Sequence, residues 1–262
     1  MPSIFTADTG ALVYAHRGAS GYAPENTMAA FKMAVELGSS GIECDVQMTK
    51  DGRLVVCHDE TLDRTTKVKG YIKDLNYDEI RELDAGSWFD SKFRNERIPR
   101  LLELLELVKD TGLLLNIEVK SGIVQYPGIE QKVLAEVAAF GLQTKVIISS
   151  FNHYSIKECK DINPSVKTGA LYMEGLFEPW NYMKSLGCEC AHPFYMALVP
   201  AIAKELKARG YIINVFTVND PKIALELVKM GADGIITNYP DRMLKALKIT
   251  NYPDRILKAL RK

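Results

Sequence analysis

The stretch GIECDVQMTKDGRLVVCH, residues 41–58, contains two β-rich runs joined only by the turn-forming segment MTKDG. So short a connection suits an antiparallel hairpin, because parallel neighbours need a crossover of about a dozen residues or more. The chain contains nine β-rich runs, and treating the second run of this pair as an antiparallel excursion leaves eight. Those eight are residues 11–15, 41–47, 113–119, 145–150, 167–172, 188–192, 211–218 and 233–237.

Segments with the apolar periodicity of amphipathic helices separate or follow the eight runs. They cover residues 27–37, 101–110, 128–140, 152–162, 178–186, 200–209, 220–230 and 240–248. Asn26 can cap the first helix and Gly38 can end it, while Asp220 and Gly231 can open and close the seventh. This alternation predicts a (β/α)8 TIM barrel as a single catalytic domain over residues 1–262, with a doubly wound open sheet as the alternative fold.

Residues 59–99 do not follow the alternation. This segment is polar and rich in turn-forming residues, and it contains one short helical stretch. We interpret it as a small insertion after strand 2, which would lie at the C-terminal face of a barrel, where active-site loops are found.

The composition excludes several classes of protein. The chain has 262 residues, and 33 lysines and arginines balance 33 aspartates and glutamates, so no global field attracts nucleic acid or an anionic membrane. The longest apolar run near the N-terminus, ALVYA, is five residues, too short for a signal sequence or a membrane span. The five cysteines are scattered and lack zinc-site spacing. We therefore expect a protein of the reducing cytoplasm.

Charged residues occupy the ends of the predicted strands. Side chains alternate across a strand, so Glu43 and Asp45 share one face while Cys44 takes the other. By the same parity, Glu118 and Lys120 share a face of the third parallel strand. Two acids directed into a barrel would be costly unless they meet a cation or water. A metal ion at the open end of the barrel is the simplest explanation.

The remaining ionisable residues complete a candidate site. His16 and Arg17 end the first strand, and the hairpin brings His58 back toward the acidic strand. Three carboxylates without an accompanying histidine or cysteine pair suit magnesium or calcium better than zinc. Two histidines can exchange protons near neutral pH. Arg17 and Lys120 supply positive charge for an oxyanion, with a phosphate as the favoured ligand.

These residues lie in strings that resemble the glycerophosphodiester phosphodiesterase family in order and spacing. The strings include HRGASGYAPENTMAAFKMAVELG, GIECDVQMTKDGRLVVCHDETLDRTT, NIEVKSG, VIISSFNH, HPF and DGIITNYP, and they run from about residue 13 to residue 247. The resemblance implies a (β/α)8 barrel that hydrolyses glycerophosphodiesters, its small-molecule substrates, to sn-glycerol 3-phosphate and an alcohol with a divalent metal. It implies metal ligation by Glu43, Asp45 and Glu118, acid/base catalysis by His16 and His58, and phosphate contacts from Arg17 and Lys120.

Four further residues are candidates for the substrate pocket. Phe216 occupies a position where many members of the family have tryptophan, which leaves an apolar wall without an N–H donor. Trp180 and Phe194 would line the pocket mouth or serve in packing. Asn26 belongs to the PENT string of the family pattern, yet helix capping explains it without a substrate.

Other interpretations stay open at this stage. Glu118 and Lys120 could simply pair with each other as a structural ion pair. A non-catalytic barrel that senses phosphodiesters is a second possibility, although a binder gains nothing from two opposed histidines. A third is a lysophospholipid-cleaving phosphodiesterase, which would need an apolar groove for an acyl chain, and the polar insertion offers little sign of one.

The C-terminal segment contains a tandem repeat. ITNYPDRMLKALK, residues 236–248, is followed directly by the 13-residue copy ITNYPDRILKALR, residues 249–261. The first copy would complete the barrel, so residues 249–262 form a duplicated tail without a place in it. Its apolar stripe predicts a short extra helix outside the barrel or at a homodimer contact, away from the metal, with a frayed appendage as the alternative.

Overall fold

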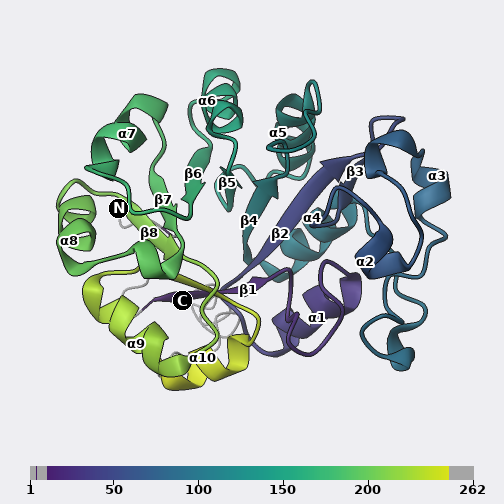
Figure 1. Cartoon of the computed structure of the whole chain (residues 1–262), viewed down its shortest axis with the longest axis horizontal. Coiled ribbons are helices and arrows are strands. Elements are labelled where there is room, and N and C mark those ends of the chain that lie inside the picture. Colours follow the sequence, from purple (N-terminus) through teal and green to yellow (C-terminus); the bar gives the residue numbers. More distant parts are fainter. Residues whose placement is uncertain (1–3, 5–10, 248–262) are drawn as a thin grey trace.

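In the computed structural model, which describes Ile4 and residues 11–247, nine strands form one sheet. Pairing of β1 with both β2 and β9 closes eight parallel strands into a ring (Figure 1). This closure confirms the predicted TIM barrel and excludes the open sheet. The parallel strands are β1 (Leu12–His16), β2 (Gly41–Met48), β4 (Leu114–Val119), β5 (Val146–Ser150), β6 (Lys167–Tyr172), β7 (Cys190–Pro193), β8 (Ile212–Val215) and β9 (Gly234–Thr237).

The ninth strand, β3 (Leu54–Val56), is the predicted hairpin partner of β2. The two strands run antiparallel, with Val46 opposite Val56 and Met48 opposite Leu54. Beyond the paired residues, the Cys57 N–H donates to the Asp45 carbonyl at 2.9 Å. The hairpin therefore returns the chain to the C-terminal end of β2, where His58 follows.

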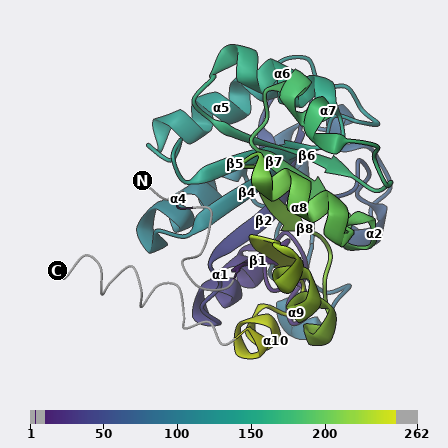
Figure 2. The same cartoon turned by 90° about the vertical axis from the view of Figure 1, so that its left-hand side faces the viewer.

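Eight helices surround the ring (Figure 1), and Figure 2 shows α9 and α10 lying side by side on its outer surface. They are α1 (Met28–Glu36), α4 (Leu101–Thr111), α5 (Ile129–Ala139), α6 (His153–Ile162), α7 (Pro179–Leu186), α8 (Pro200–Ala208), α9 (Pro221–Met230) and α10 (Pro240–Ala246). As predicted, the Asp220 carboxylate caps α9 and Gly231 ends it in a left-handed conformation. Gly38, also left-handed, follows the end of α1.

The cap predicted at Asn26 is wrong. Thr27 caps α1 instead, its hydroxyl accepting a hydrogen bond from the Ala30 N–H. The reason is that Asn26 takes a left-handed backbone conformation with φ +55° and its side-chain amide donates to Asp45 at 2.8 Å. A local capping signal is overridden by a tertiary contact.

Polarity changes along the inside of the barrel. Cys44 and its outward-facing neighbours pack against the helices in the main apolar core. Inside the ring, Leu12 and Leu114 belong to an apolar layer near the N-terminal ends of the strands. Farther along β4, Asn116 and Glu118 line a small cavity on the barrel axis. The carboxylates Glu43 and Glu118 therefore face the interior at the C-terminal ends of their strands, above the apolar layer.

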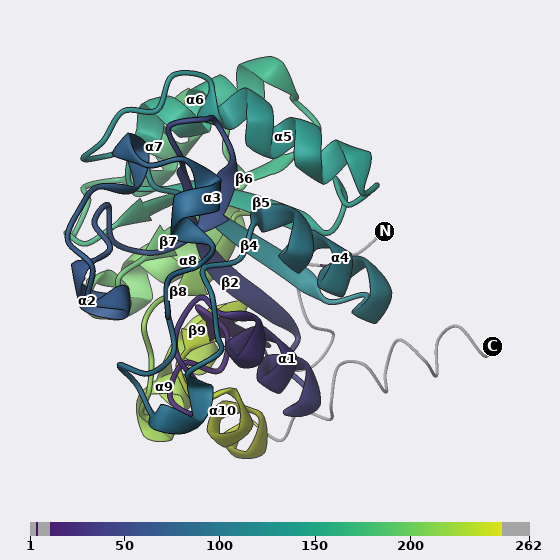
Figure 3. The same cartoon turned by 90° about the vertical axis from the view of Figure 1, so that its right-hand side faces the viewer.

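The insertion is more ordered than its sequence predicts. The expectation of one short helical stretch is wrong, because the segment contains α2 (Asp63–Thr66), α3 (Tyr77–Ile80) and two 3-10 turns, η1 (Ile72–Asp74) and η2 (Ser91–Phe93). Its apolar side chains form a small core with the hairpin, comprising Val55, Cys57, Leu62, Ile72, Ile80, Ala85 and Ile98. Figure 3 shows α3 in front of the barrel strands and α2 toward one side of them.

Two further predictions from the sequence concern the C-terminal tail and membrane-spanning helices. The predictions for the tail, residues 249–262, lie outside the described residues. Within the described part of the chain, no helix has the length and apolar character that a bilayer crossing requires.

Candidate active site

Three carboxylates converge at the C-terminal end of the barrel. Glu43 and Asp45 project from β2, and the register of the sheet pairs Asp45 with Glu118 of β4. One oxygen of each group lies within 4.8 Å of the other two, and the residues are only 4%, 1% and 9% exposed. Alternation along the two strands is sufficient to produce this cluster, as expected from the sequence.

The cluster is electrostatically strained. Burial, then the negative charges of Asp45 and Glu118, raise the pKa of Glu43 well above its ordinary value. Burial and Asp45 likewise raise the pKa of Glu118. For Asp45, burial acts in the same direction, but Arg17 and Lys120 outweigh it and lower the pKa. Three buried hard oxygen donors that repel one another fit a divalent cation of the magnesium or calcium type.

The two cations of the site are engaged by these acids. The Lys120 ammonium donates to Glu118 at 2.9 Å and lies 3.8 Å from Asp45. The Arg17 guanidinium donates to Glu25 at 2.8 Å, and its Nε lies 3.3 Å from Asp45. The Arg17 backbone N–H donates to Glu43 at 2.9 Å. The predicted Glu118–Lys120 pair therefore exists, but as part of a larger network.

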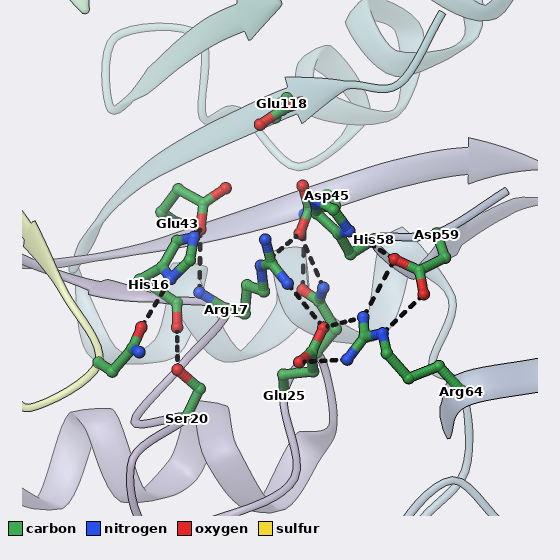
Figure 4. Close-up of polar contacts among 12 residues, drawn as sticks. His16, Arg17, Ser20, Glu25, Glu43, Asp45, His58, Asp59, Arg64 and Glu118 are labelled. Carbon is green, nitrogen blue, oxygen red and sulfur yellow. Dashed lines mark hydrogen bonds and ion pairs between the residues drawn. The ribbon is translucent and has the colours of Figure 1, made fainter. Parts of the chain in front are cut away.

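The two histidines have different hydrogen-bond partners (Figure 4). His16 Nδ1 lies 2.7 Å from the Asn238 amide oxygen, so this nitrogen is the donor, and Nε2 lies 3.9 Å from Glu43. Burial foremost, and then Arg17, lowers the pKa of His16 to about 4. His58 Nδ1 instead lies 2.7 Å from a carboxylate oxygen of Asp59. His16 thus has a neutral partner and His58 an anionic one.

Arg64 of α2 connects the insertion to the site (Figure 4). Its guanidinium donates to both oxygens of Glu25 at 2.8 Å and to Asp59 at 2.7 Å. Burial acts to raise the pKa of Asp59, but hydrogen bonds from Arg64 and His58 hold it at about 2. The sequence reasoning missed Arg64, Asp59 and Asn238, and a carboxylate directly following a candidate histidine was the available signal.

The four candidate pocket residues lie in different places. Phe216 lines the axial cavity of about 20 Å³ together with His16 and Glu43. Phe194 and Trp180 line a neighbouring groove of about 730 Å³, and the Trp180 ring also packs under Arg209 at 4.6 Å. Asn26 is 4% exposed, and its side-chain amide donates a hydrogen bond to the Asp45 carboxylate.

Comparison with known proteins identifies the family. A model of the glycerophosphoryl diester phosphodiesterase family matches residues 16–242. The chain belongs to this family. Its relatives include glycerophosphodiester phosphodiesterases, which are hydrolases, so this family member is an enzyme of the hydrolase class, and the resemblance found in the sequence motifs is confirmed.

Individual relatives of the family member cover nearly all of it. A glycerophosphodiester phosphodiesterase of Caldanaerobacter subterraneus subsp. tengcongensis is 48% identical over 90% of this chain and 98% of its own length. A glycerophosphodiester phosphodiesterase of Bacillus subtilis is 36% identical over 90% of this chain and 86% of its own. A solved phosphodiesterase of Oleispira antarctica, in complex with the product sn-glycerol-3-phosphate, matches with a TM-score of 0.83 at 32% identity, covering 91% of this chain and 97% of that one.

The family match begins at His16, so it includes both histidines and all three clustered carboxylates. It also includes Asn238, at the end of β9, but ends before the duplicated tail. The candidate site is thus contained in the part of the chain that defines the family.

Proposed function

We propose that this family member is a divalent-metal-dependent glycerophosphodiester phosphodiesterase that releases sn-glycerol 3-phosphate and an alcohol. The observation that carries the proposal is the meeting of three buried carboxylates with two histidines at the barrel mouth, by which we mean the C-terminal end of the barrel strands. A barrel that only bound a phosphodiester would use Arg17 and Lys120, but it would have no use for histidines with opposite hydrogen-bond partners.

Glu43, Asp45 and Glu118 would hold the metal ion. When bound, the cation would polarise a phosphoryl oxygen of the substrate. The charges of the site support this role. The three carboxylates with Arg17 and Lys120 carry one net negative charge, and a divalent cation turns this into one positive charge. A phosphodiester, which carries a single negative charge, would neutralise it.

His16 would act as the general base. Asn238 occupies Nδ1, so the lone pair of Nε2 is available on the side of Glu43. Because the pKa of His16 is lowered to about 4, the ring is uncharged at neutral pH and can accept the proton of the attacking oxygen. Arg17 and Lys120 would contact the phosphate oxygens as negative charge builds up on them.

His58 would act as the general acid. Its Nδ1 lies 2.7 Å from the Asp59 carboxylate, which orients the ring, and in the proposed cycle His58 carries the second proton as an imidazolium. The Nε2–H of that imidazolium would then protonate the oxygen of the departing alcohol as its bond to phosphorus breaks. Proton transfers of this kind typically contribute about 10²- to 10⁴-fold each.

The direct test uses glycerophosphocholine with magnesium or calcium, after chelation of any co-purified metal, and couples sn-glycerol 3-phosphate to a dehydrogenase readout. We expect turnover that requires added metal and is lost again in excess chelator. Full activity in excess chelator would contradict the metal role. No turnover of any glycerophosphodiester with either metal would contradict the function.

A further inference from the structure

A buried chain of hydrogen bonds ends on the backbone of His58. The Gln47 side-chain amide donates from Nε2 to the His58 carbonyl at 3.1 Å, and its Oε1 accepts a hydrogen bond from the Tyr126 hydroxyl at 2.7 Å. Gln47 is fully buried and Tyr126 is only 6% exposed. We call these three linked groups, the Tyr126 hydroxyl, the Gln47 amide and the His58 carbonyl, the Gln47 bridge.

The alternation that places the carboxylates also places Gln47. It follows Glu43 and Asp45 at two-residue steps along β2, so the three side chains share one face of the strand. Because β3 runs antiparallel to β2, with Val55 opposite Gln47, the hairpin brings His58 back within reach of this amide. The bridge therefore connects the strand that carries two of the clustered acids to the segment that carries the proposed general acid.

The two partners of Gln47 fix the orientation of its amide. The His58 carbonyl can only accept a hydrogen bond, so the NH2 end of the amide must face it, and the oxygen end then faces Tyr126. Burial raises the pKa of the Tyr126 phenol, which therefore keeps its proton and remains a donor. The Tyr126 ring packs in the main apolar core. Any rearrangement of the bridge would leave a buried polar group unpaired, which is costly.

The segment that contains His58 has little regular structure of its own. It lies between the end of β3 at Val56 and the start of α2 at Asp63. Asp59, which contacts the His58 ring, belongs to the same irregular segment. A general acid must lie within hydrogen-bond reach of the atom that it protonates, and an error of about 1 Å in its position can lower the rate about 10²-fold. The Gln47 bridge supplies an anchor for His58 from the packed interior.

We propose that Gln47 is a positioning residue for His58, which holds the His58 backbone where the imidazole can reach the oxygen of the departing alcohol, and that Tyr126 supports Gln47 in this role. The inference rests on the proposed function, in which His58 protonates the leaving group. Gln47 itself does not touch the substrate. Its removal should therefore matter only where the leaving group needs a proton, whereas a general structural role would affect every substrate alike.

Two substrates with different leaving groups test the proposal. Gln47→Met keeps a side chain of similar volume without its hydrogen bonds, and kcat with glycerophosphocholine should fall by roughly 10- to 100-fold with little change in KM. With the nitrophenyl ester of glycerol 3-phosphate, whose leaving group needs little protonation, kcat should stay close to that of the wild type. An equal loss on both substrates, or no loss on either, would overturn the proposal. Turnover of glycerophosphocholine by the wild type reports separately on the proposed function.

Tyr126→Phe provides a second variant that should fold normally, because it removes only a hydroxyl. It should show the same dependence on the leaving group, with a loss of at most about tenfold on glycerophosphocholine, as expected for one hydrogen bond. Tyr211→Phe is the matched control, since its hydroxyl donates to the Trp180 carbonyl at 3.1 Å and the residue precedes β8 at the opposite end of the barrel. It should keep wild-type kinetics on both substrates.

A double-mutant cycle separates action through His58 from action by another route. If Gln47 acts by positioning His58, adding Gln47→Met to His58→Ala should lower kcat with glycerophosphocholine little further. Additive losses in the folded double variant would overturn the proposal, even if each single variant lost activity.

Discussion

The barrel mouth has two unlike halves. The charged half, built by β1, β2 and the insertion, carries ionisable side chains joined by hydrogen bonds (Figure 4). The apolar half, built by the connections after β6 and β7, surrounds a groove with exposed apolar side chains. In the charged half, Arg17 and Arg64 each contact two carboxylates. In the apolar half, Phe177 and Met196 are mostly exposed. The contrast separates a half whose charged groups hold one another in place from a half that leaves large apolar side chains exposed to solvent.

The largest effect should come from the charged half. Glu43→Gln keeps an acceptor for the Arg17 N–H but removes one negative charge from the proposed metal site. Because Lewis-acid catalysis supplies several kcal/mol and each 1.36 kcal/mol is tenfold in rate, kcat should fall by roughly 10³-fold on every substrate alike. Titration calorimetry should show weaker binding of magnesium or calcium. Normal metal affinity in a folded variant would break the assignment of this half to metal binding.

The histidines should give the next largest effect. His16→Ala and His58→Ala should each lower kcat by at least about 10²-fold, with circular dichroism confirming the fold. A nitrophenolate leaving group needs little protonation, so a nitrophenyl phosphodiester should partly rescue His58→Ala but not His16→Ala. The reverse pattern of rescue would exchange their roles within the charged half.

A smaller effect should follow from loosening the insertion contacts. Asp59→Asn removes the anion behind His58, and loss of such an orienting partner typically costs about 10- to 100-fold, which we expect in kcat more than in KM. Arg64→Ala should act in the same direction, whereas Arg94→Ala, an exposed change in the same insertion, is the control.

If Asp59 acts through His58, adding Asp59→Asn to His58→Ala should reduce kcat little further. Additive losses would instead show that Asp59 serves the site by another route, and the asymmetry proposed for the two histidines would lose its basis.

The charged half was largely predictable because its placement follows from local rules. Alternation along β2 and β4 is enough to bring Glu43, Asp45 and Glu118 together once the strands are parallel neighbours. The contact between Arg64 and Glu25 was not predictable, since it depends on how the folded insertion sits on the barrel. Asn26 shows the same limit, because its local capping signal gave no hint of its contact with Asp45.

The apolar half could not be derived from the sequence for a different reason. Phe194 and Trp180 have the same apolar character whether they pack in a core or line a groove, and periodicity cannot distinguish the two. The groove is lined by residues of the two connections that follow β6 and β7. The course of these connections is a property of loop geometry, on which strand and helix patterns carry little information.

The smallest effect should come from the duplicated tail. The last barrel helix, α10, ends at Ala246, and its Met243 and Leu244 are buried against the core, so the described residues already supply the eight strands and the last helix of the ring. Both halves of the mouth lie before that point. We therefore propose that residues 249–262 are dispensable for catalysis, and that a chain ending at residue 248 keeps the kcat/KM of the full chain. A change only in melting temperature or sedimentation would fit a role in stability or association. A folded truncation that loses kcat would instead show that the second copy, not the first, completes the barrel.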